Sequence, residues 1–214
     1  MWNYLILNRM ISLLSGRINK ICVDRFVKIK VTIRVWRIEG GRIVNRIIYK
    51  LWQDVPKKYA YQLWQNPDVA KYIHKNGMFS DDEVEDRVFV ENQQFDEHGV
   101  QYFPIFINED ADEVFIGVAG LRLTTENGVF EFGIHLLPEF WHQGFASEAG
   151  QHILNWGFND LGAQEIRAGH NPNNHASKKM LTRLGFNYVF DQYYAPTGLN
   201  HPTYSLTFDN YKNN

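Results

Sequence analysis

Residues 143–147 combine the residue types and the spacing that bind an anion. Before them, 130–137 is an apolar stretch typical of a strand, and Pro138 ends it. After them, small residues begin a helix near Ala146. The first N–H groups of a helix lack intrahelical acceptors and carry partial positive charge. Gly144 has no Cβ, so the backbone can approach a ligand closely. We therefore expect a phosphorylated ligand at this loop.

The helix that positions the loop presents one face of small and apolar residues. Its first two turns offer only Ala and Gly on that face, and Gly162 is a natural C-cap. An ordinary strand–loop–helix connection without a ligand would show the same spacing. Residues at three- and four-residue spacing form the face that packs on a sheet: Ala146, Ala149, Gly150, Ile153, Leu154, Gly157 and Leu161.

Two motifs in this part of the chain resemble those of a known family. The first, E-F-G-I-H-L-L-P-E-F-W-H-Q-G-F-A-S-E-A (131–149), resembles the acetyl-CoA-binding segment of the GNAT N-acetyltransferases, most of all their RimJ/RimL-like branch. The second, N-N-H-A-S-K-K-M-L-T-R-L-G-F (173–186), is similar to that family's N-x-x-S-x-x-x-x-x-x-x-G-F. The resemblance covers about residues 44–214. It implies an acetyl-CoA-dependent N-acetyltransferase.

The resemblance also implies how acetyl-CoA binds. The family's pantetheine arm pairs with the fourth strand, here Ile134, His135 and Leu136, and an N–H there is available to the thioester oxygen. The two central strands must splay apart to admit the arm, and Gly133 is a plausible bulge position. Backbone N–H groups would face the pyrophosphate at these positions: Gln143, Gly144, Phe145, Ala146 and Ser147.

The second motif adds two cofactor contacts and leaves one gap. Asn174 and Ser177 fall where the family's side chains contact the cofactor. Asn174 could equally be only a helix N-cap that accepts from the Ser177 N–H. Many relatives place a tyrosine seven residues after the motif asparagine to protonate the leaving thiolate, but here that position is Leu181. The proton source stays open among the nearby tyrosines, which are Tyr188, Tyr193 and Tyr194.

Glu131 is the first candidate for the base that deprotonates the acceptor amine. A carboxylate on a central strand would sit at the cleft, where partial burial raises the pKa towards that of a useful base. The alternative is an outward-facing glutamate that pairs with Arg122 across the hairpin. His135 and His170 are further candidate bases. The eight His and one Cys show no metal-ligand spacing, so we expect no metal.

Trp141 is another departure from the wider superfamily, whose loop begins with Arg or Gln at this position. The RimJ/RimL-like branch also has Trp here. One side-chain contact to phosphate is therefore missing, although a backbone cradle does not need it.

The pattern of elements predicts an α/β (α+β) fold with a mixed, mostly antiparallel sheet flanked by helices, which is the GNAT order. Ser80 and Glu83 form a capping box, and we interpret the acids of the helix that follows as a solvated face. Asn127-Gly128 is a hairpin signal. Strands are expected at 46–52, 102–107, 114–124, 129–137, 165–168, 186–194 and 203–208, and helices after Pro56, at 80–98, from 146 and at 174–184.

Charge separates the first part of the chain from the rest. Residues 1–50 hold eleven Lys and Arg against two acids, whereas 51–214 hold eleven bases against twenty-two acids, which together give the net −2. We interpret 1–43 as a basic extension, disordered or spurious from an upstream start codon, with targeting or docking as the alternative. A single cysteine, Cys22, suits a reducing compartment, so we expect a cytoplasmic protein. No apolar run is long enough for a membrane span.

Together these features predict a domain at 44–214 that transfers an acetyl group directly, in a ternary complex, to a primary amine. The acceptor is a small molecule, an amino acid or a protein N-terminus, and the protein is a monomer or homodimer. The alternative is a non-catalytic module that binds or senses acyl-CoA. Nucleic-acid binding through the basic extension is a further alternative, which the acidic body of the domain opposes.

Overall fold

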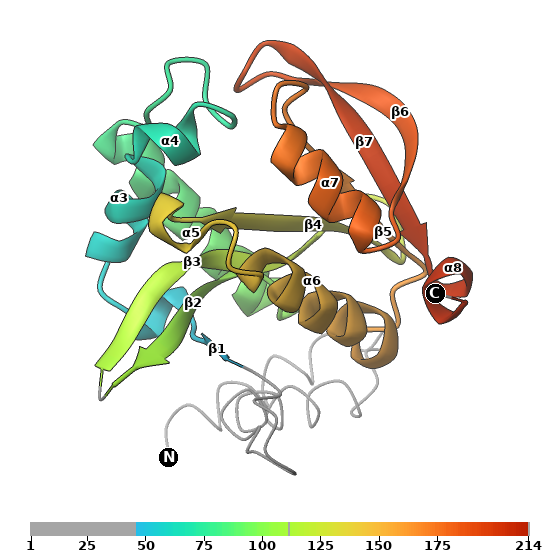
Figure 1. Cartoon of the computed structure of the whole chain (residues 1–214), viewed down its shortest axis with the longest axis horizontal. Coiled ribbons are helices and arrows are strands. Elements are labelled where there is room, and N and C mark those ends of the chain that lie inside the picture. The colour runs from blue at the N-terminus through green and yellow to red at the C-terminus, as the bar shows by residue number, and fades with distance from the viewer. Residues whose placement is uncertain (1–45, 111, 214) are drawn as a thin grey trace. The chain divides into compact units, whose positions relative to one another are not determined.

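The computed structural model describes residues 46–110 and 112–213, so the basic extension lies outside the described residues. A seven-stranded sheet in the order β1-β2-β3-β4-β5-β7-β6 forms the centre of the domain (Figure 1). Among the described strands, only β4 and β5 pair in parallel. The strands are β1 (Ile47–Tyr49), β2 (Tyr102–Glu109), β3 (Asp112–Leu123), β4 (Val129–Leu136), β5 (Glu165–Gly169), β6 (Asn187–Tyr194) and β7 (Leu199–Thr207).

Helices cover the sheet in two groups (Figure 1). One hydrophobic cluster packs α3 to α5 against the sheet, and a second packs α6 and α7 against it. The mixed, mostly antiparallel sheet with flanking helices confirms the predicted fold class. The helices are α3 (Lys58–Trp64), α4 (Pro67–Ala70), α5 (Asp81–His98), α6 (Phe145–Asn155), α7 (His175–Arg183) and α8 (Phe208–Lys212), with short helical turns η1 (Trp52–Asp54), η2 (Pro138–Phe140) and η3 (Trp156–Asp160).

The local signals placed most element ends correctly. Ser80 accepts from the Glu83 N–H at 3.3 Å and the Glu83 side chain accepts from the Ser80 N–H at 2.8 Å, so the capping box of α5 is present. Gly99 ends that helix in the left-handed conformation. The Asn127-Gly128 hairpin also forms, although residues 124–128 all lie between the paired strands.

Helix α6 carries the small-residue face that the spacing predicts. The buried members of this face pack tightly: a Cβ at Gly150 would come within 2.5 Å of Leu184, and one at Gly157 within 2.8 Å of Leu121 and Ile166. After α6 the chain continues as the π-helical η3, and Gly162 follows with φ 71°. The C-cap prediction is therefore confirmed.

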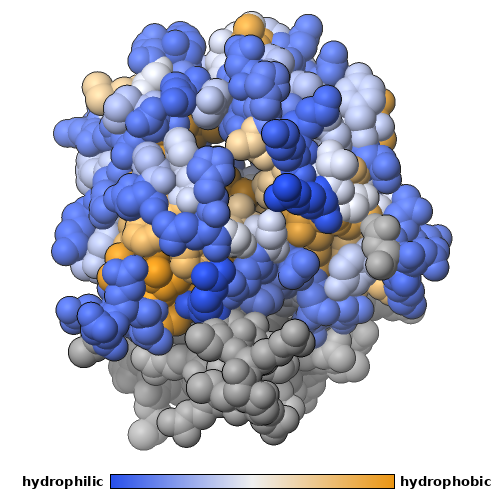
Figure 2. Space-filling view, viewed as in Figure 1, coloured by the Kyte–Doolittle hydropathy of each residue, from blue (hydrophilic) through white to orange (hydrophobic). Residues whose placement is uncertain are grey.

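The sheet opens between β4 and β5, its two central strands. They pair only from Val129 to Glu131, opposite Glu165 to Arg167. The rest of β4 stays paired with β3 in unbroken register, so the bulge predicted at Gly133 is wrong. Figure 2 shows this face hollowed near its centre, between the part occupied by α3 and α4 in Figure 1 and the part occupied by α7.

Candidate active site

The loop between β4 and α6 presents a row of free backbone N–H groups. Gly144 precedes α6 with φ 87°, a conformation that favours glycine. The loop is held by its own chain, since Trp141 Nε1 donates to the Leu136 carbonyl at 2.8 Å. Within the described residues, no acceptor contacts the N–H groups of 143–147. This is the set predicted to hold a pyrophosphate: Gln143, Gly144, Phe145, Ala146 and Ser147.

Arg46 reaches this loop from the start of β1, which the sequence did not indicate. Its Nε donates to Glu148 at 2.8 Å, and its Nη2 donates to the Gln143 carbonyl at 3.2 Å. The guanidinium lies 4.1 Å from the centre of the Phe145 ring. A Cβ added to Gly144 would come within 3.6 Å of it. Arg46 thus supplies positive charge beside the loop and balances Glu148, which would otherwise repel an anion there.

The free edge of β4 faces the opening between the two central strands. The Leu137 N–H donates to the Ile116 carbonyl at 2.9 Å, and hydrogen-bonding direction alternates along an antiparallel pair. The N–H and C=O groups of Ile134 and Leu136 therefore point away from β3, toward the opening, and of these the Leu136 carbonyl already accepts from Trp141 Nε1. The same alternation turns the backbone of His135 toward β3. Two of the three residues predicted to pair with a pantetheine arm can do so.

The start of α7 lies beyond the opening, where the second motif was found. Asn174 caps this helix by accepting from the Ser177 N–H at 3.0 Å. Its side-chain amide nitrogen makes no hydrogen bond within the described residues, so the cap leaves a donor for a ligand. A shallow, strongly basic groove runs along α7, and it is lined by His175, Lys178, Lys179, Thr182 and Arg183.

Glu131 lies on the face of β4 that looks toward α3 to α5. Its side chain is exposed, so the expected partial burial is wrong. Arg122 stands opposite it in the register, but the hydrogen bond comes from elsewhere: Tyr102 Oη donates to Glu131 Oε1 at 2.8 Å. Burial, and then the charge of Glu131, raise the pKa of Tyr102 well above its usual range, so the phenol remains a donor.

The absence of a side chain at Gly133 leaves room for the Tyr102 ring, so that its hydroxyl can contact Glu131. A Cβ at Gly133 would collide with the Tyr102 ring. The glycine predicted as a bulge therefore serves a close side-chain approach across two strands.

Arg122 pairs with Glu91 of α5 instead of with Glu131. Glu91 is fully buried, and its other oxygen accepts from the Tyr102 N–H at 2.7 Å. The interpretation of the α5 acids as a solvated face is therefore wrong at this position. The pair fixes Tyr102 from both ends, because Arg122 also lies 4.3 Å from the centre of its ring.

His135 lies on the same face as Glu131, two residues beyond Gly133. Trp64 Nε1 donates to its Nδ1 at 3.3 Å. Burial, followed by the positive charges of Arg87 and Arg122, lowers the pKa of His135 to about 3. The ring is neutral at physiological pH and its Nδ1 already accepts a hydrogen bond. These contacts oppose its role as a base.

This burial predicts how stability depends on pH. Below about pH 6.5 an unfolded His135 binds a proton that the folded chain refuses until about pH 3. The free energy of unfolding should therefore fall as pH drops through this window, by up to about 1.4 kcal/mol per pH unit. His135→Gln keeps an acceptor for Trp64 but does not titrate. The free energy of unfolding of this variant, measured in urea, should therefore lose this part of its dependence on pH. If the free energy of unfolding changes equally with pH in the wild type and in His135→Gln between pH 6 and 4, the prediction is contradicted.

The other residues named for proton transfer are dispersed. His170 is buried, its Nδ1 contacts the Asn171 carbonyl at 2.8 Å, and burial lowers its pKa. Leu181 is core, which agrees with the missing tyrosine at that position. Tyr188 and Tyr193 are exposed, whereas Tyr194 is partly buried and close enough to Arg87 to influence its pKa.

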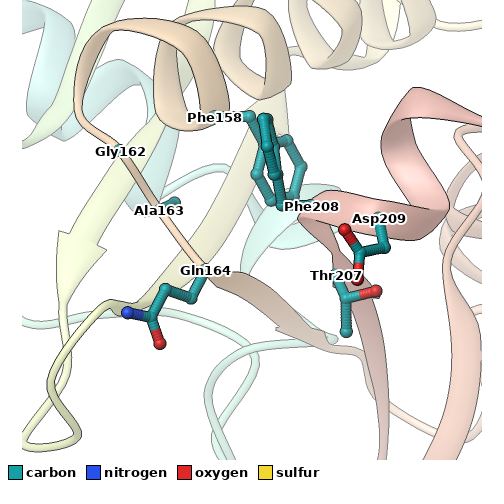
Figure 3. A pocket seen from close by; sticks show the side chains of 7 residues that line it. All are labelled: Phe158, Gly162, Ala163, Gln164, Thr207, Phe208 and Asp209. Carbon is teal, nitrogen blue, oxygen red and sulfur yellow. The ribbon is translucent and has the colours of Figure 1, made fainter.

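A cavity of about 370 Å³ lies far from these residues, at the other end of α6 (Figure 3). It is lined by Phe158, Gly162, Ala163, Gln164, Thr207, Phe208 and Asp209. Neither motif contributes to it, and Asp209 is its one ionisable side chain. We assign it no part in the site. In the described residues no three His, Cys, Asp or Glu side chains group to hold a metal, and no helix there is long and apolar enough to cross a membrane.

Comparison with known proteins agrees with this geometry. Residues 46–187 match the family described as acetyltransferase (GNAT) domain. An uncharacterized N-acetyltransferase p20 of Bacillus licheniformis is 35% identical over 126 residues, covering 58% of this chain and 70% of that protein. The chain belongs to the GNAT family, in its RimJ/RimL-like branch, and is an N-acetyltransferase.

Solved structures show the same fold. A GNAT-family acetyltransferase from Bacillus anthracis matches with a TM-score of 0.62 at 20% identity, over 77% of this chain and 96% of that one. Spermidine N-acetyltransferase from Vibrio cholerae, solved with CoA and spermine, matches with a TM-score of 0.62 at 18% identity, over 78% and 98%. GNAT enzymes use acetyl-CoA, and the second structure holds CoA.

Proposed function

We propose that this chain binds acetyl-CoA between β4 and β5 and transfers the acetyl group to a small primary amine. One observation carries the proposal. The free N–H groups of 143–147 lie just beyond the end of β4. In the described part of the chain no strand pairs with the β4 edge at Ile134 and Leu136, where both N–H groups and the Ile134 carbonyl are free. The row of donors suits a pyrophosphate, and the open strand edge suits an amide-containing arm. The basic groove along α7, the helix that Asn174 caps, adds charge for the remaining phosphate.

The transfer needs no covalent intermediate on the protein. The amine nitrogen attacks the thioester carbon, the C–N bond forms, and the C–S bond breaks to release CoA as the thiolate. Glu131 takes the proton that makes the amine neutral, directly or through one water. The nitrogen loses a second proton as the amide forms, and this proton neutralises the departing thiolate. The N–H of Ile134 or Leu136 donates to the oxygen as negative charge develops on it. Tyr102 orients Glu131 by its 2.8 Å hydrogen bond.

The experiment is a calorimetric titration of acetyl-CoA into the full chain, followed by an acceptor screen that detects released CoA thiol. We expect micromolar binding and release that depends on an added primary amine. Binding without release to any amine would favour the acyl-CoA sensor. A folded protein that does not bind at millimolar acetyl-CoA would contradict the proposal.

Arg46 should contribute to cofactor affinity without taking part in the chemistry. We expect Arg46→Gln to raise the KM for acetyl-CoA about three- to tenfold and to leave kcat unchanged, since one exposed charge contributes modestly to binding. Lys50→Gln is the matched control, because it removes a nearby charge that pairs with Glu113.

A double variant separates two explanations of that effect. If Arg46 acts only by balancing Glu148, then Arg46→Gln combined with Glu148→Gln should restore the KM. If Arg46 contacts a phosphate directly, the KM should stay high. An unchanged KM in the single variant would remove Arg46 from the site.

A further inference from the structure

Arg87 of α5 is a partly buried cation that makes no hydrogen bond or ion pair within the described residues. Its Nε is buried and makes no hydrogen bond, and within residues 46–110 and 112–213 no carboxylate pairs with its guanidinium. The nearest candidate, Glu91, is already occupied by Arg122 and the Tyr102 N–H. A partly buried charge without a partner is unfavourable, so the guanidinium is available to an anion outside the described chain.

Aromatic rings hold the Arg87 guanidinium in place and leave its donors free. Its central carbon lies 4.8 Å from the centre of the Trp64 ring and 5.0 Å from that of Phe79. Rings contact the face of a guanidinium, whereas its N–H groups point outward in the plane. That arrangement is preorganised for a planar, two-oxygen anion such as a carboxylate.

The position of Arg87 connects it with the proposed acceptor side. Trp64, which supports Arg87, also donates to His135 on β4. His135 packs edge-on against Tyr102, which in turn donates to Glu131. The Arg87 guanidinium and the Glu131 carboxylate therefore look onto the same face of β4, one at each end of this chain of contacts.

A hydrogen bond also joins the two sides of the domain that flank the opening. The Lys75 N–H donates to the Pro196 carbonyl at 2.7 Å, so the loop after α4 meets the tip of the β6–β7 hairpin (Figure 1).

We propose that the acceptor is a small amino acid-like molecule whose carboxylate binds Arg87 while its amine lies at Glu131. This inference rests on the proposed acetyl transfer and narrows its acceptor class. It also separates this chain from an enzyme for polyamines, whose cationic acceptors Arg87 would repel.

The test compares each amino acid with the amine that remains after removal of its carboxylate. Because the second amine is the more basic of the two, each rate is expressed per unit concentration of neutral amine. Thiol release is measured for acidic, aromatic and aliphatic pairs with the full chain. We expect kcat/KM to be roughly ten- to a hundredfold higher for the acid in at least one pair, the range for a hydrogen bond to a charged group. Polyamines should be poor acceptors.

Variants assign the preference to Arg87. Arg87→Gln should lose that preference by lowering kcat/KM for the acid while changing it less than threefold for the matching amine. Arg87→Lys, which keeps the charge, tests the same point if the first variant unfolds, and should retain part of the preference. Lys212→Gln on α8 is the control for loss of a distant positive charge.

The outcomes are distinct. Equal or better transfer to the amines without a carboxylate, unchanged in Arg87→Gln, would overturn the inference and leave the proposed function standing. A preference that survives in both Arg87 variants would also overturn it. Absence of transfer to every amine would contradict the proposed function itself.

Discussion

Replacing Gly144 by Glu should weaken acetyl-CoA binding by roughly a hundredfold or more, since like charges a few ångströms apart repel strongly near a protein surface. The new carboxylate would stand in the row of N–H groups at 143–147, where the phosphates are proposed to bind. Space is not the obstacle, because the atom nearest to an added Cβ is Arg46 Nη2 at 3.6 Å. Calorimetric titration measures the loss directly.

The other end of the same helix offers a matched control. Gly162 also has a positive φ, 71° against 87° at Gly144, and an added Cβ there meets nothing within 4 Å. Glu at either position carries a similar backbone strain of roughly 1–2 kcal/mol. Gly162→Glu should therefore lose comparable stability yet bind acetyl-CoA normally. Equal loss of binding in both variants would show that strain in α6 causes the effect, and would contradict the cradle.

Short-range signals explain why so much of the fold was predictable. The capping box, the helix-ending glycines and the hairpin each depend on residues within a few positions, so their chemistry is legible in the sequence. Gly144 belongs to this group, because its left-handed conformation and the free N–H groups beside it are consequences of a loop entering a helix.

The parts that the sequence did not disclose depend on register and on long-range contacts. Arg46 meets Glu148 across 102 positions. The spacing of Glu91 from Val84 and Val88 places it on the inward face of α5, but its pairing with Arg122 depends on how α5 packs against the sheet. Backbone direction alternates from one residue to the next along β4. The N–H and C=O groups of Ile134 and Leu136 therefore face the opening, whereas those of His135 face β3.

Replacing Glu131 by Gln should lower kcat for acetyl transfer by about 10²–10⁴-fold, the usual contribution of a positioned general base. Gln keeps the size of the side chain and an oxygen that can accept from Tyr102, so the geometry should survive. The affinity for acetyl-CoA should not change, since Glu131 is proposed to meet the amine and not the cofactor. Glu109→Gln, an exposed strand glutamate at the end of β2, serves as the control.

The pH profile distinguishes a base from a merely structural carboxylate. Without Glu131, only amine that has already lost its proton to solvent can react, so the rate of Glu131→Gln should climb with pH toward that of the wild type. A structural defect would lower the rate equally at every pH. Tyr102→Phe should show a smaller loss of the same kind, because it removes the donor that orients Glu131 while keeping the base. If Glu131→Gln instead retains activity within threefold at neutral pH, the carboxylate is not the base. His135, neutral and already accepting from Trp64, could not then take its place.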